Sequence, residues 1–276
     1  MNTLQSWSEY IMQLHSKRID LSLDRMMLVA QRMDLLTFDC PVITVAGTNG
    51  KGSTCAMLEA IYRANGYKTG LYSSPHLVYL GERIQINRQA ITEAKILVYC
   101  ERLKSAAQAI SHGDPDQHPS FFELMTAMAL LYFSEQKVDI ALIETGLGGR
   151  LDATNILIPH LSVITSIGLD YTEILGDSIA AIAREKAGII KADVPVVTGA
   201  LPADAGCVVQ EVAAKLQAPL QALSPELSEF PATNLAGSFQ AWNAALALLA
   251  VETLQGHWKV EPSLAKSALQ SVHWKG

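Results

Sequence analysis

The chain has 276 residues, 49% of them hydrophobic and 17% charged, which is ample for a buried core and excludes a disordered chain or a small disulfide scaffold. Its 21 lysines and arginines stand against 27 aspartates and glutamates, a net charge of −6, and form no basic stripe, which argues against nucleic acid as a partner. No run approaches the roughly 18 apolar residues of a membrane span, and the first residues show no basic start followed by an apolar core. We therefore expect a soluble protein of one or two domains with no membrane partner.

The four cysteines lie far apart and form no CxxC pair. Each stands in an apolar or helical context, where a reduced, packed thiol is the ordinary outcome. The cysteines are Cys40, Cys55, Cys100 and Cys207. Their pattern favours a reducing, cytoplasmic location.

Helical spacing of apolar residues predicts two helices in the first 40 residues, around Trp7–Leu14 and Met26–Leu36. A short β-branched run at 41–47 then ends in glycine, a Gly-rich turn follows, and a helix is expected over 55–66. With a second strand at 68–74, this unit has the length of a βαβ crossover in a parallel sheet.

The rest of the chain repeats the alternation of strand and helix. Residues 75–92 and 218–235 show weak periodicity and are not assigned. The expected strands are nearly unbroken apolar runs, as in a sheet that is buried on both faces, at 138–145, 161–168 and 194–199. Helices are expected at 92–110, 121–136, 178–190, 203–217, 238–256 and 261–272. This order predicts a doubly wound α/β fold with a mostly parallel sheet.

The clearest chemical signal is the segment 45–54, where a strand passes into a helix. Glycines let backbone N–H groups surround phosphate oxygens, the helix N-terminus adds positive charge, and Lys51 can reach the outer phosphates. Against the general P-loop pattern, Val45 replaces the first glycine and Gly52 the hydroxyl residue, so Ser53 or Thr54 would supply the hydroxyl. A turn used only for packing would leave the lysine unexplained. The predicted nucleotide contacts are Gly47, Thr48, Asn49, Gly50, Lys51, Gly52 and Ser53.

This loop, GTNGKGS, resembles that of the ATP-dependent amide ligases that include the Mur ligases and the folylpolyglutamate synthases, and the glycine after the lysine is similar to the folate branch. Five further motifs of the folate branch follow in family order. They are the Ser-Pro-His-Leu loop in Tyr72–Leu77, Glu82–Ile84, Phe122–Thr126, the signature Glu144–Asn155, and Arg184–Ile189. The chain is most similar to the bacterial bifunctional dihydrofolate synthase/folylpolyglutamate synthases.

The resemblance implies a three-layer P-loop domain like the central domain of the Mur ligases. It implies an enzyme of folate biosynthesis and one-carbon metabolism that uses ATP and Mg²⁺ to add L-glutamate to dihydropteroate and folates through an acyl phosphate. Catalysis of this kind depends on positioning and charge neutralisation more than on a protein nucleophile. The catalytic residues implied are Lys51, Glu144 and Lys186.

The family assigns magnesium ligation to residues that match Ser74 and Glu144. Lys186 matches a lysine that is carbamylated in relatives, and carbamylation would convert it into a further metal ligand. Tyr171 stands where relatives carry a histidine ligand, and because a neutral phenol is a poor Mg²⁺ ligand, we expect a weakened second metal site. The alternatives are a helix-capping carboxylate for Glu144, an ordinary loop hydroxyl for Ser74, and a solvated charge for Lys186.

Substrate contacts also follow from the resemblance. The residues that match pterin-binding segments are Asp20, Leu21, Ser22, Phe122, Glu123, Leu151, Asp152 and Ala153. For Asp20 and Glu123, helix capping is an alternative. Asn243 matches an asparagine near the adenine nucleotide, with a helix-surface amide as the alternative, and His76 either takes part in catalysis or shapes its loop.

Family members continue into a second α/β domain after a Gly-Arg junction, which Lys275-Gly276 resembles. We therefore expect residues 1–276 to be the N-terminal ATPase and pterin-binding domain, without the C-terminal glutamate-ligase domain, and to bind ATP as a monomer with little turnover. A noncatalytic nucleotide-binding module and a P-loop phosphotransferase remain as alternative functions.

Overall fold

The computed structural model describes Tyr10, residues 22–226 and residues 229–274. Its centre is an eight-stranded sheet in the order β4-β3-β2-β5-β1-β6-β7-β8. The strands are β1 (Val42–Ala46), β2 (Thr69–Tyr72), β3 (Ile84–Ile86), β4 (Gln89–Ala90), β5 (Ile140–Glu144), β6 (Leu161–Ile164), β7 (Val196–Thr198) and β8 (Leu220–Ala222). All neighbouring pairs are parallel except β2–β3 and β3–β4, so the expected α/β fold with a mostly parallel sheet is confirmed.

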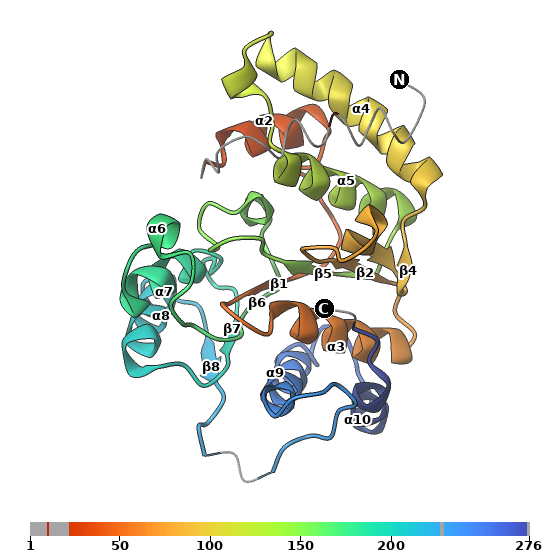
Figure 1. The fold of residues 1–276 in the computed structure, drawn as a ribbon. Helices are drawn as coiled ribbons and strands as arrows, with labels where there is room; N and C mark the ends of the chain where they lie inside the picture. Colours follow the sequence, from red (N-terminus) through yellow and green to blue (C-terminus); the bar gives the residue numbers. More distant parts are fainter. Residues whose placement is uncertain (1–9, 11–21, 227–228, 275–276) are drawn as a thin grey trace.

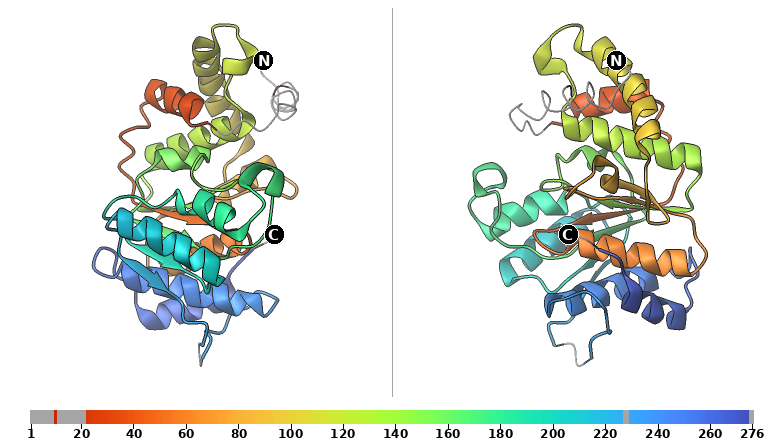
Figure 2. Two further views of the ribbon diagram at one scale, coloured as in Figure 1. Left: turned by 90° about the vertical axis from the view of Figure 1, so that its left-hand side faces the viewer. Right: turned by 45° about the vertical axis from the view of Figure 1, so that its right-hand side comes forward.

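Helices cover both faces of the sheet and make three layers (Figures 1 and 2). The α-helices are α2 (Asp24–Arg32), α3 (Lys51–Ala64), α4 (Glu93–Ser111), α5 (Phe121–Gln136), α6 (Thr172–Leu175), α7 (Ile179–Ala187), α8 (Ala203–Lys215), α9 (Phe239–Thr253) and α10 (Pro262–Ala268). Short 3₁₀ turns add η1 (Leu80–Arg83), η2 (Pro115–Gln117), η3 (Ala153–Ile156) and η4 (Leu269–Ser271).

The alternation of side chains along β1 decides which helices pack on which face. Ile43 and Val45 point into a core formed with α3, α9 and α10. Val42 points to the opposite face, which α2, α4 and α5 cover, and Ala46 lies on that same face beneath α7 and α8. Every residue of β1 is therefore buried, as expected for a central parallel strand.

Several boundaries differ from the sequence expectations. Helix α3 begins at Lys51 instead of 55, because Gly50 adopts the left-handed conformation at its N-cap and the phosphate-loop residues form the first helical turn. Helix α2 ends at Arg32, before the left-handed Asp34. The helix expected around Trp7–Leu14 lies outside the described residues except for Tyr10.

The two unassigned segments contain edge strands. Residues 75–92 form η1, β3 and β4, and residues 218–235 contain β8. These strands have only two or three residues, and both β4 residues are exposed, so no alternation of apolar and polar residues marks them. The single turn of α6 was also not expected.

Two expectations from composition can be compared with the structure. None of the helices in the described part of the chain is both long and apolar enough to cross a membrane. All four cysteines are free, with Cys55 and Cys100 buried, but Cys207 is exposed on α8, so the expectation of a packed thiol is wrong there.

Candidate functional site

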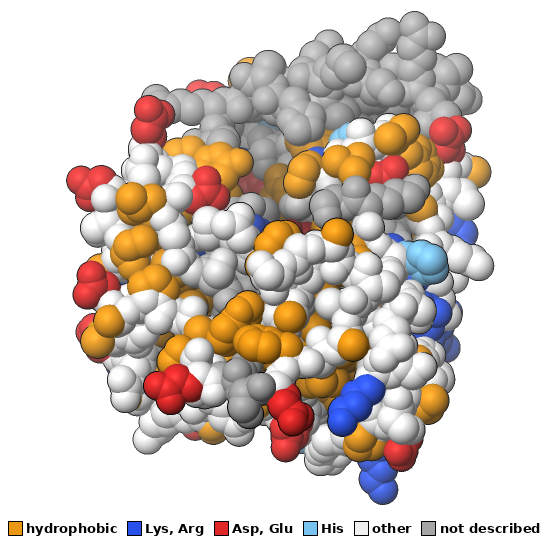
Figure 3. Space-filling view, turned by 60° about the horizontal axis from the view of Figure 1, so that its bottom comes forward, with side chains coloured by type: hydrophobic (Ala, Val, Ile, Leu, Met, Phe, Trp, Pro, Cys, Tyr) orange, Lys and Arg blue, Asp and Glu red, His pale blue; other side chains and the backbone are white. Residues whose placement is uncertain are grey.

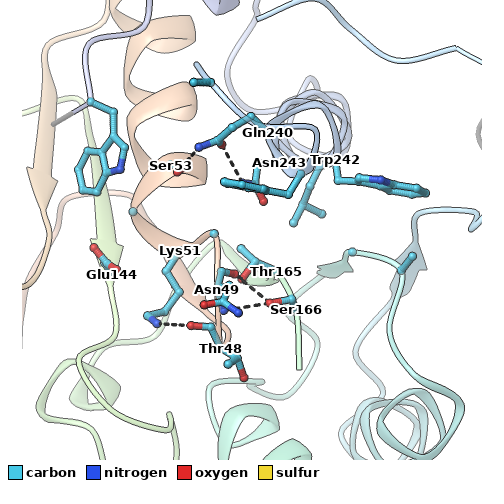
Figure 4. Close-up of a pocket in the computed structure, with 18 residues that line it drawn as sticks. Thr48, Asn49, Lys51, Ser53, Glu144, Thr165, Ser166, Gln240, Trp242 and Asn243 are labelled. Atoms are coloured by element: carbon cyan, nitrogen blue, oxygen red, sulfur yellow. Dashed lines mark hydrogen bonds between the residues drawn. The ribbon is translucent and has the colours of Figure 1, made fainter. Parts of the chain in front are cut away.

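A cavity of about 1020 Å³ lies at the edge of the sheet where the parallel strands end (Figure 4). Open α/β sheets bind ligands at this edge. The loops after β1, β6 and β7, the first turn of α3 and the start of α9 form its walls. Its lining comprises Thr48, Asn49, Gly50, Lys51, Gly52, Ser53, Glu144, Thr165, Ser166, Gly199, Ala200, Ala236, Phe239, Gln240, Trp242, Asn243, Leu246 and Trp274.

The loop after β1 is held in shape by the loop after β6. The Thr48 N–H donates to the Ser166 carbonyl at 2.7 Å, and the Asn49 N–H donates to the Ser166 hydroxyl at 3.0 Å. The Thr165 hydroxyl donates to the Asn49 carbonyl at 2.6 Å. Because the first N–H groups of α3 have no acceptor within the helix, this fixed loop presents free donors and a positive helix end to the cavity.

Two lysines converge on one carbonyl of this loop. The ammonium of Lys51 donates to the carbonyls of Gly47 and Thr48 at 3.0 and 3.1 Å, and Lys186 reaches the Gly47 carbonyl at 2.9 Å. Lys186 is only 3% exposed, so the solvated alternative is wrong. Burial, helped by the neighbouring Lys51 charge, lowers the pKa of Lys186 to about 8.

Glu144 ends β5 beside the phosphate loop and lines the same cavity as Lys51. It is 4% exposed, and burial raises its pKa to about 7 despite the opposing effects of the Lys51 charge and a hydrogen bond from the Ser74 N–H at 3.2 Å. This bond joins the loop after β2 to the end of β5. Glu144 caps none of the described helices, and its carboxylate instead accepts from the Ser74 N–H and lies near the Lys51 and Arg83 charges.

The donor set at this point suits a hard cation in part. Glu144 supplies carboxylate oxygens, and the hydrogen bond from the Ser74 N–H brings the loop that carries Ser74 beside them. Among the described residues no group of three His, Cys, Asp or Glu side chains could by itself hold a metal. The site therefore fits a metal that takes its remaining ligands from phosphate or water.

Tyr171 lies in a left-handed turn before α6 and is 56% exposed. Its phenol is not among the residues that line the cavity. The phenol is thus not buried in the cavity. The weakened second metal site that we expect at this position stays a prediction.

Helix α9 forms the wall opposite the loop. The Asn243 amide donates to the Gln240 side chain at 2.9 Å, and the Gln240 amide donates to the Ser53 hydroxyl at 3.1 Å. Asn243 is 8% exposed, so the helix-surface alternative is wrong. A Cβ on Gly50 would lie 2.4 Å from the Asn243 Oδ1, which ties the loop glycine to this asparagine.

The cavity also has aromatic walls. Phe239 is exposed, and Trp242 packs edge-on against Phe230 with ring centroids 4.7 Å apart. Figure 3 shows hydrophobic side chains gathered near the middle of one face of the molecule, with charged side chains mostly around its edges. On the other side, a Cβ on Gly52 would lie 2.3 Å from the Trp274 ring, which explains why the position after Lys51 has no side chain.

The predicted substrate residues in the described part of the chain do not line this cavity, and their roles stay predictions. The Phe122 ring packs against Gly146 and Tyr72. Ser22 is hydrogen-bonded to Asp24, while Leu151 is half-buried and Ala153 buried. Asp20 and Leu21 lie outside the described residues.

Two of the predicted substrate carboxylates have structural partners. Glu123 forms a capping box with Ser120 at the start of α5, as the helix-cap alternative expects, and pairs with Arg25 at 3.2 Å. Asp152 accepts hydrogen bonds from the N–H groups of Gly146, Leu147 and Thr154 and from the Thr154 hydroxyl. Burial raises the pKa of Asp152, and these bonds oppose that rise. Asp152 therefore organises the loop after β5.

Sequence reasoning missed Thr165, Ser166, Gln240 and Trp274 as site residues. Their hydrogen bonds and contacts join segments more than 100 residues apart, and no local motif marks them. A hydroxyl pair directly after a strand that neighbours β1 was the one signal available for Thr165 and Ser166.

No family model matches the chain. The dihydrofolate synthase/folylpolyglutamate synthase of Escherichia coli (strain K12) is 45% identical over 216 residues, which cover 78% of this chain and 50% of that protein. The apo form of L. casei FPGS has a TM-score of 0.89 at 30% identity and covers 97% of this chain and 72% of its own. The E. coli FolC structure in complex with DHPP and ADP has a TM-score of 0.85 at 37% identity, with 98% and 66% covered. The chain spans about half the length of the curated relatives it matches.

Proposed function

The chain belongs to the dihydrofolate synthase/folylpolyglutamate synthase family, and on that premise we propose that it carries the ATP-binding part of a ligase that adds L-glutamate to dihydropteroate and folates. One observation carries the proposal. The loop around Lys51 and the carboxylate of Glu144 line a single cavity, large enough for a nucleotide, at the ligand-binding edge of the sheet. The E. coli relative, whose structure contains DHPP and ADP, supports a nucleotide and a pterin compound as ligands.

The protein itself takes little part in the covalent steps of this reaction. A carboxylate oxygen of the substrate attacks the γ-phosphorus of ATP, ADP leaves, and an acyl phosphate forms. The glutamate amine then attacks the acyl carbon, phosphate leaves, and the amine loses a proton. Each step crowds oxyanions together, so the site must position them and neutralise their charge, which is the role proposed for Lys51 and the free N–H groups of α3.

Magnesium would be held by Glu144 and Ser74, and it would supply charge neutralisation for the phosphates. Lys186 suits the proposed carbamylation because its lowered pKa leaves part of the amine neutral at physiological pH, and a neutral amine can attack carbon dioxide. The product carbamate would bring a second carboxylate-like group close to the phosphate loop. Asn243 and the aromatic wall of Trp242 would contact the adenine base.

We propose further that residues 1–276 act as one ATP- and pterin-binding domain, monomeric and cytoplasmic. The continuous core on both faces of one sheet supports a single domain. The reduced state of its cysteines supports a cytoplasmic setting. Glutamate binding would then depend on a region that corresponds to the remaining half of the E. coli relative.

The test is an assay of labelled L-glutamate incorporation into dihydropteroate with ATP and Mg²⁺. The chain is assayed alone and as a chimera followed by the C-terminal part of the E. coli relative. We expect little product from the chain and clear product from the chimera, which a Lys51→Met variant abolishes and a Lys191→Met control retains. Lys191 donates to the Asn155 carbonyl and does not line the cavity.

Other results would point to the alternatives. ATP binding without amide formation by either protein would favour a noncatalytic nucleotide-binding module. Transfer of phosphate to a hydroxyl or nucleotide acceptor in the absence of glutamate would favour a P-loop phosphotransferase.

A further inference from the structure

Arg83, at the end of η1, is a buried cation that has no carboxylate partner in the described part of the chain. Arg83 is only 6% exposed. No carboxylate of a described residue lies within 4 Å of it, whereas the partly buried Arg25 and Arg88 are each within 4.0 Å of a glutamate. A buried charge that lacks a counter-ion is costly and is retained where an anion binds.

The guanidinium of Arg83 is fixed in place on two sides. Its Nε donates to the His76 Nδ1 at 2.8 Å, so this ring nitrogen is unprotonated. The guanidinium carbon lies 5.1 Å from the centroid of the Phe121 ring. These contacts orient the guanidinium but do not neutralise its charge.

The outer nitrogens of Arg83 remain available. Neither Nη1 nor Nη2 donates a hydrogen bond to a described residue, and neither is among the fully buried side-chain atoms that lack a partner. The tip of the guanidinium therefore keeps access to solvent. The two Nη groups, held in a fixed plane, match the paired oxygens of a carboxylate or of a phosphate.

Glu144 is the nearby group that comes closest to a counter-ion for Arg83, and it is a weak one. Burial lowers the pKa of Arg83, and the negative charge of Glu144 only partly opposes this. Arg83 thus has room for a further negative group.

The position of Arg83 indicates which anion this is. Its carbonyl accepts from the Ser73 N–H at 3.0 Å, beside the loop whose Ser74 N–H contacts Glu144. Its guanidinium lies over Phe121, next to Phe122, whose ring faces Tyr72 and Gly146. Arg83 therefore lies between the predicted pterin contact and the predicted magnesium ligand, and outside the lining of the nucleotide cavity.

We propose that Arg83 binds the carboxylate of the pteroate substrate and that His76 is the positioning residue that orients its guanidinium. This inference rests on the proposed function, because it assigns a residue to that substrate. The carboxylate would pair with Arg83 on the Phe122 side of Glu144, with its reactive oxygen directed to the phosphate loop. The α-carboxylate of glutamate has the same chemistry, and the experiment separates the two sources.

The experiment is a calorimetric titration with a non-hydrolysable ATP analogue and Mg²⁺ present. Dihydropteroate and its analogue with hydrogen in place of the carboxylate are titrated into the unaltered chain, Arg83→Met, Arg83→Lys and Arg88→Met. We expect the unaltered chain to prefer dihydropteroate at least tenfold. Arg83→Met should bind both compounds alike, Arg83→Lys should keep a preference of a few fold, and Arg88→Met should keep the full preference.

A purely structural role for Arg83 gives a different pattern. If Arg83→Met weakens both compounds equally and keeps the tenfold ratio, or if it loses affinity for the ATP analogue to the same degree, the proposal is wrong. If Arg83→Met does not fold, the ratio in Arg83→Lys decides, and an unchanged ratio overturns the proposal.

Failure of the proposed function gives a result of its own. If the unaltered chain binds neither pterin compound, the assignment of a pteroate substrate fails, and the role of Arg83 fails with it. If the chain binds dihydropteroate with the same ratio in every variant, only the role of Arg83 is refuted.

Discussion

At the scale of single residues, the site brings together charged groups that are energetically unfavourable in the folded chain without ligands. Lys51 and Lys186 share the Gly47 carbonyl, Glu144 is buried with a raised pKa, and Arg83 lacks a carboxylate partner among the described residues. Each of these charges lowers the stability of the folded chain without ligands, and binding of oppositely charged ligands raises that stability again. Such perturbed groups at a cavity are typical of functional sites.

Glu144 should make the metal-free chain less stable as pH rises. Its folded-state pKa of about 7 lies above its ordinary value of 4.5, so the folded chain binds more protons than the unfolded chain between these values. Stability from this group therefore falls from about pH 4.5 to pH 7, and the cost is fully present above pH 7. Glu144→Gln should be more stable than the unaltered chain at pH 8 by up to about 3 kcal/mol and nearly equal at pH 4.

Urea unfolding in EDTA across this pH range measures the difference. Glu226→Gln, which changes an exposed carboxylate, is the control and should show no such trend. If Glu144→Gln has the same free energy of unfolding as the unaltered chain at every pH, the charge of Glu144 does not destabilise the fold, which would contradict its burial.

Tyr171 offers a second test at this scale. An imidazole is a better metal ligand than a neutral phenol, so Tyr171→His should increase Mg²⁺ affinity in the presence of an ATP analogue by about tenfold if this position faces the second metal. A magnesium titration followed by calorimetry measures it. An unchanged titration curve would argue against a metal site beside Tyr171.

At the scale of elements, the repeated alternation of strand and helix could be predicted from the sequence, but the shortest strands could not. The unbroken apolar runs of β1, β5, β6 and β7 announce strands buried on both faces, and the P-loop glycines mark the start of α3. The strands β4 and β8 lie at the edges of the sheet and β3 lies beside β4, and strands of two or three residues give no pattern. Contacts such as Gln240 with Ser53, 187 residues apart, depend on the packing of α9 on α3 and have no local signal.

The two ends of α3 provide a matched pair of glycines. Gly50 and Gly66 have nearly equal φ values of 84° and 87°, but a Cβ on Gly50 would collide with Asn243, while one on Gly66 would meet nothing within 4 Å. Alanine at either position should cost about 1 kcal/mol of stability for the left-handed conformation. Gly50→Ala should in addition displace Asn243 and weaken ATP-analogue binding at least tenfold.

Thermal unfolding and calorimetry on the two variants separate these effects. Equal nucleotide affinity in Gly50→Ala and Gly66→Ala would show that the contact between Gly50 and Asn243 does not shape the nucleotide site.

At the scale of the whole molecule, one sheet supplies both the core and the site. The same helix, α9, buries Leu246 against α3 and β1 and presents Asn243 to the cavity. The layered fold could be predicted from the alternation of strand and helix. The approach of α9 to the phosphate loop follows from how the layers pack, and only the resemblance at Asn243 indicated it.

Removal of a core side chain should therefore affect both properties. Leu246→Ala should cost about 2–5 kcal/mol of stability and lower nucleotide affinity, because Leu246 is buried in the core and also lines the cavity. Leu264→Ala, at an exposed position on α10, should change stability by less than about 0.5 kcal/mol. Denaturant unfolding with and without the ATP analogue measures both effects, and a core substitution that leaves binding intact would separate the site from the core.

The most direct test is a crystal structure of the chain with Mg²⁺ and a non-hydrolysable ATP analogue. We predict the triphosphate on the N–H groups of the loop before α3, the Lys51 ammonium on its outer phosphates, and Mg²⁺ at about 2.1 Å from a Glu144 oxygen. A nucleotide bound elsewhere, or one in this cavity whose metal is held without Glu144, would contradict the account.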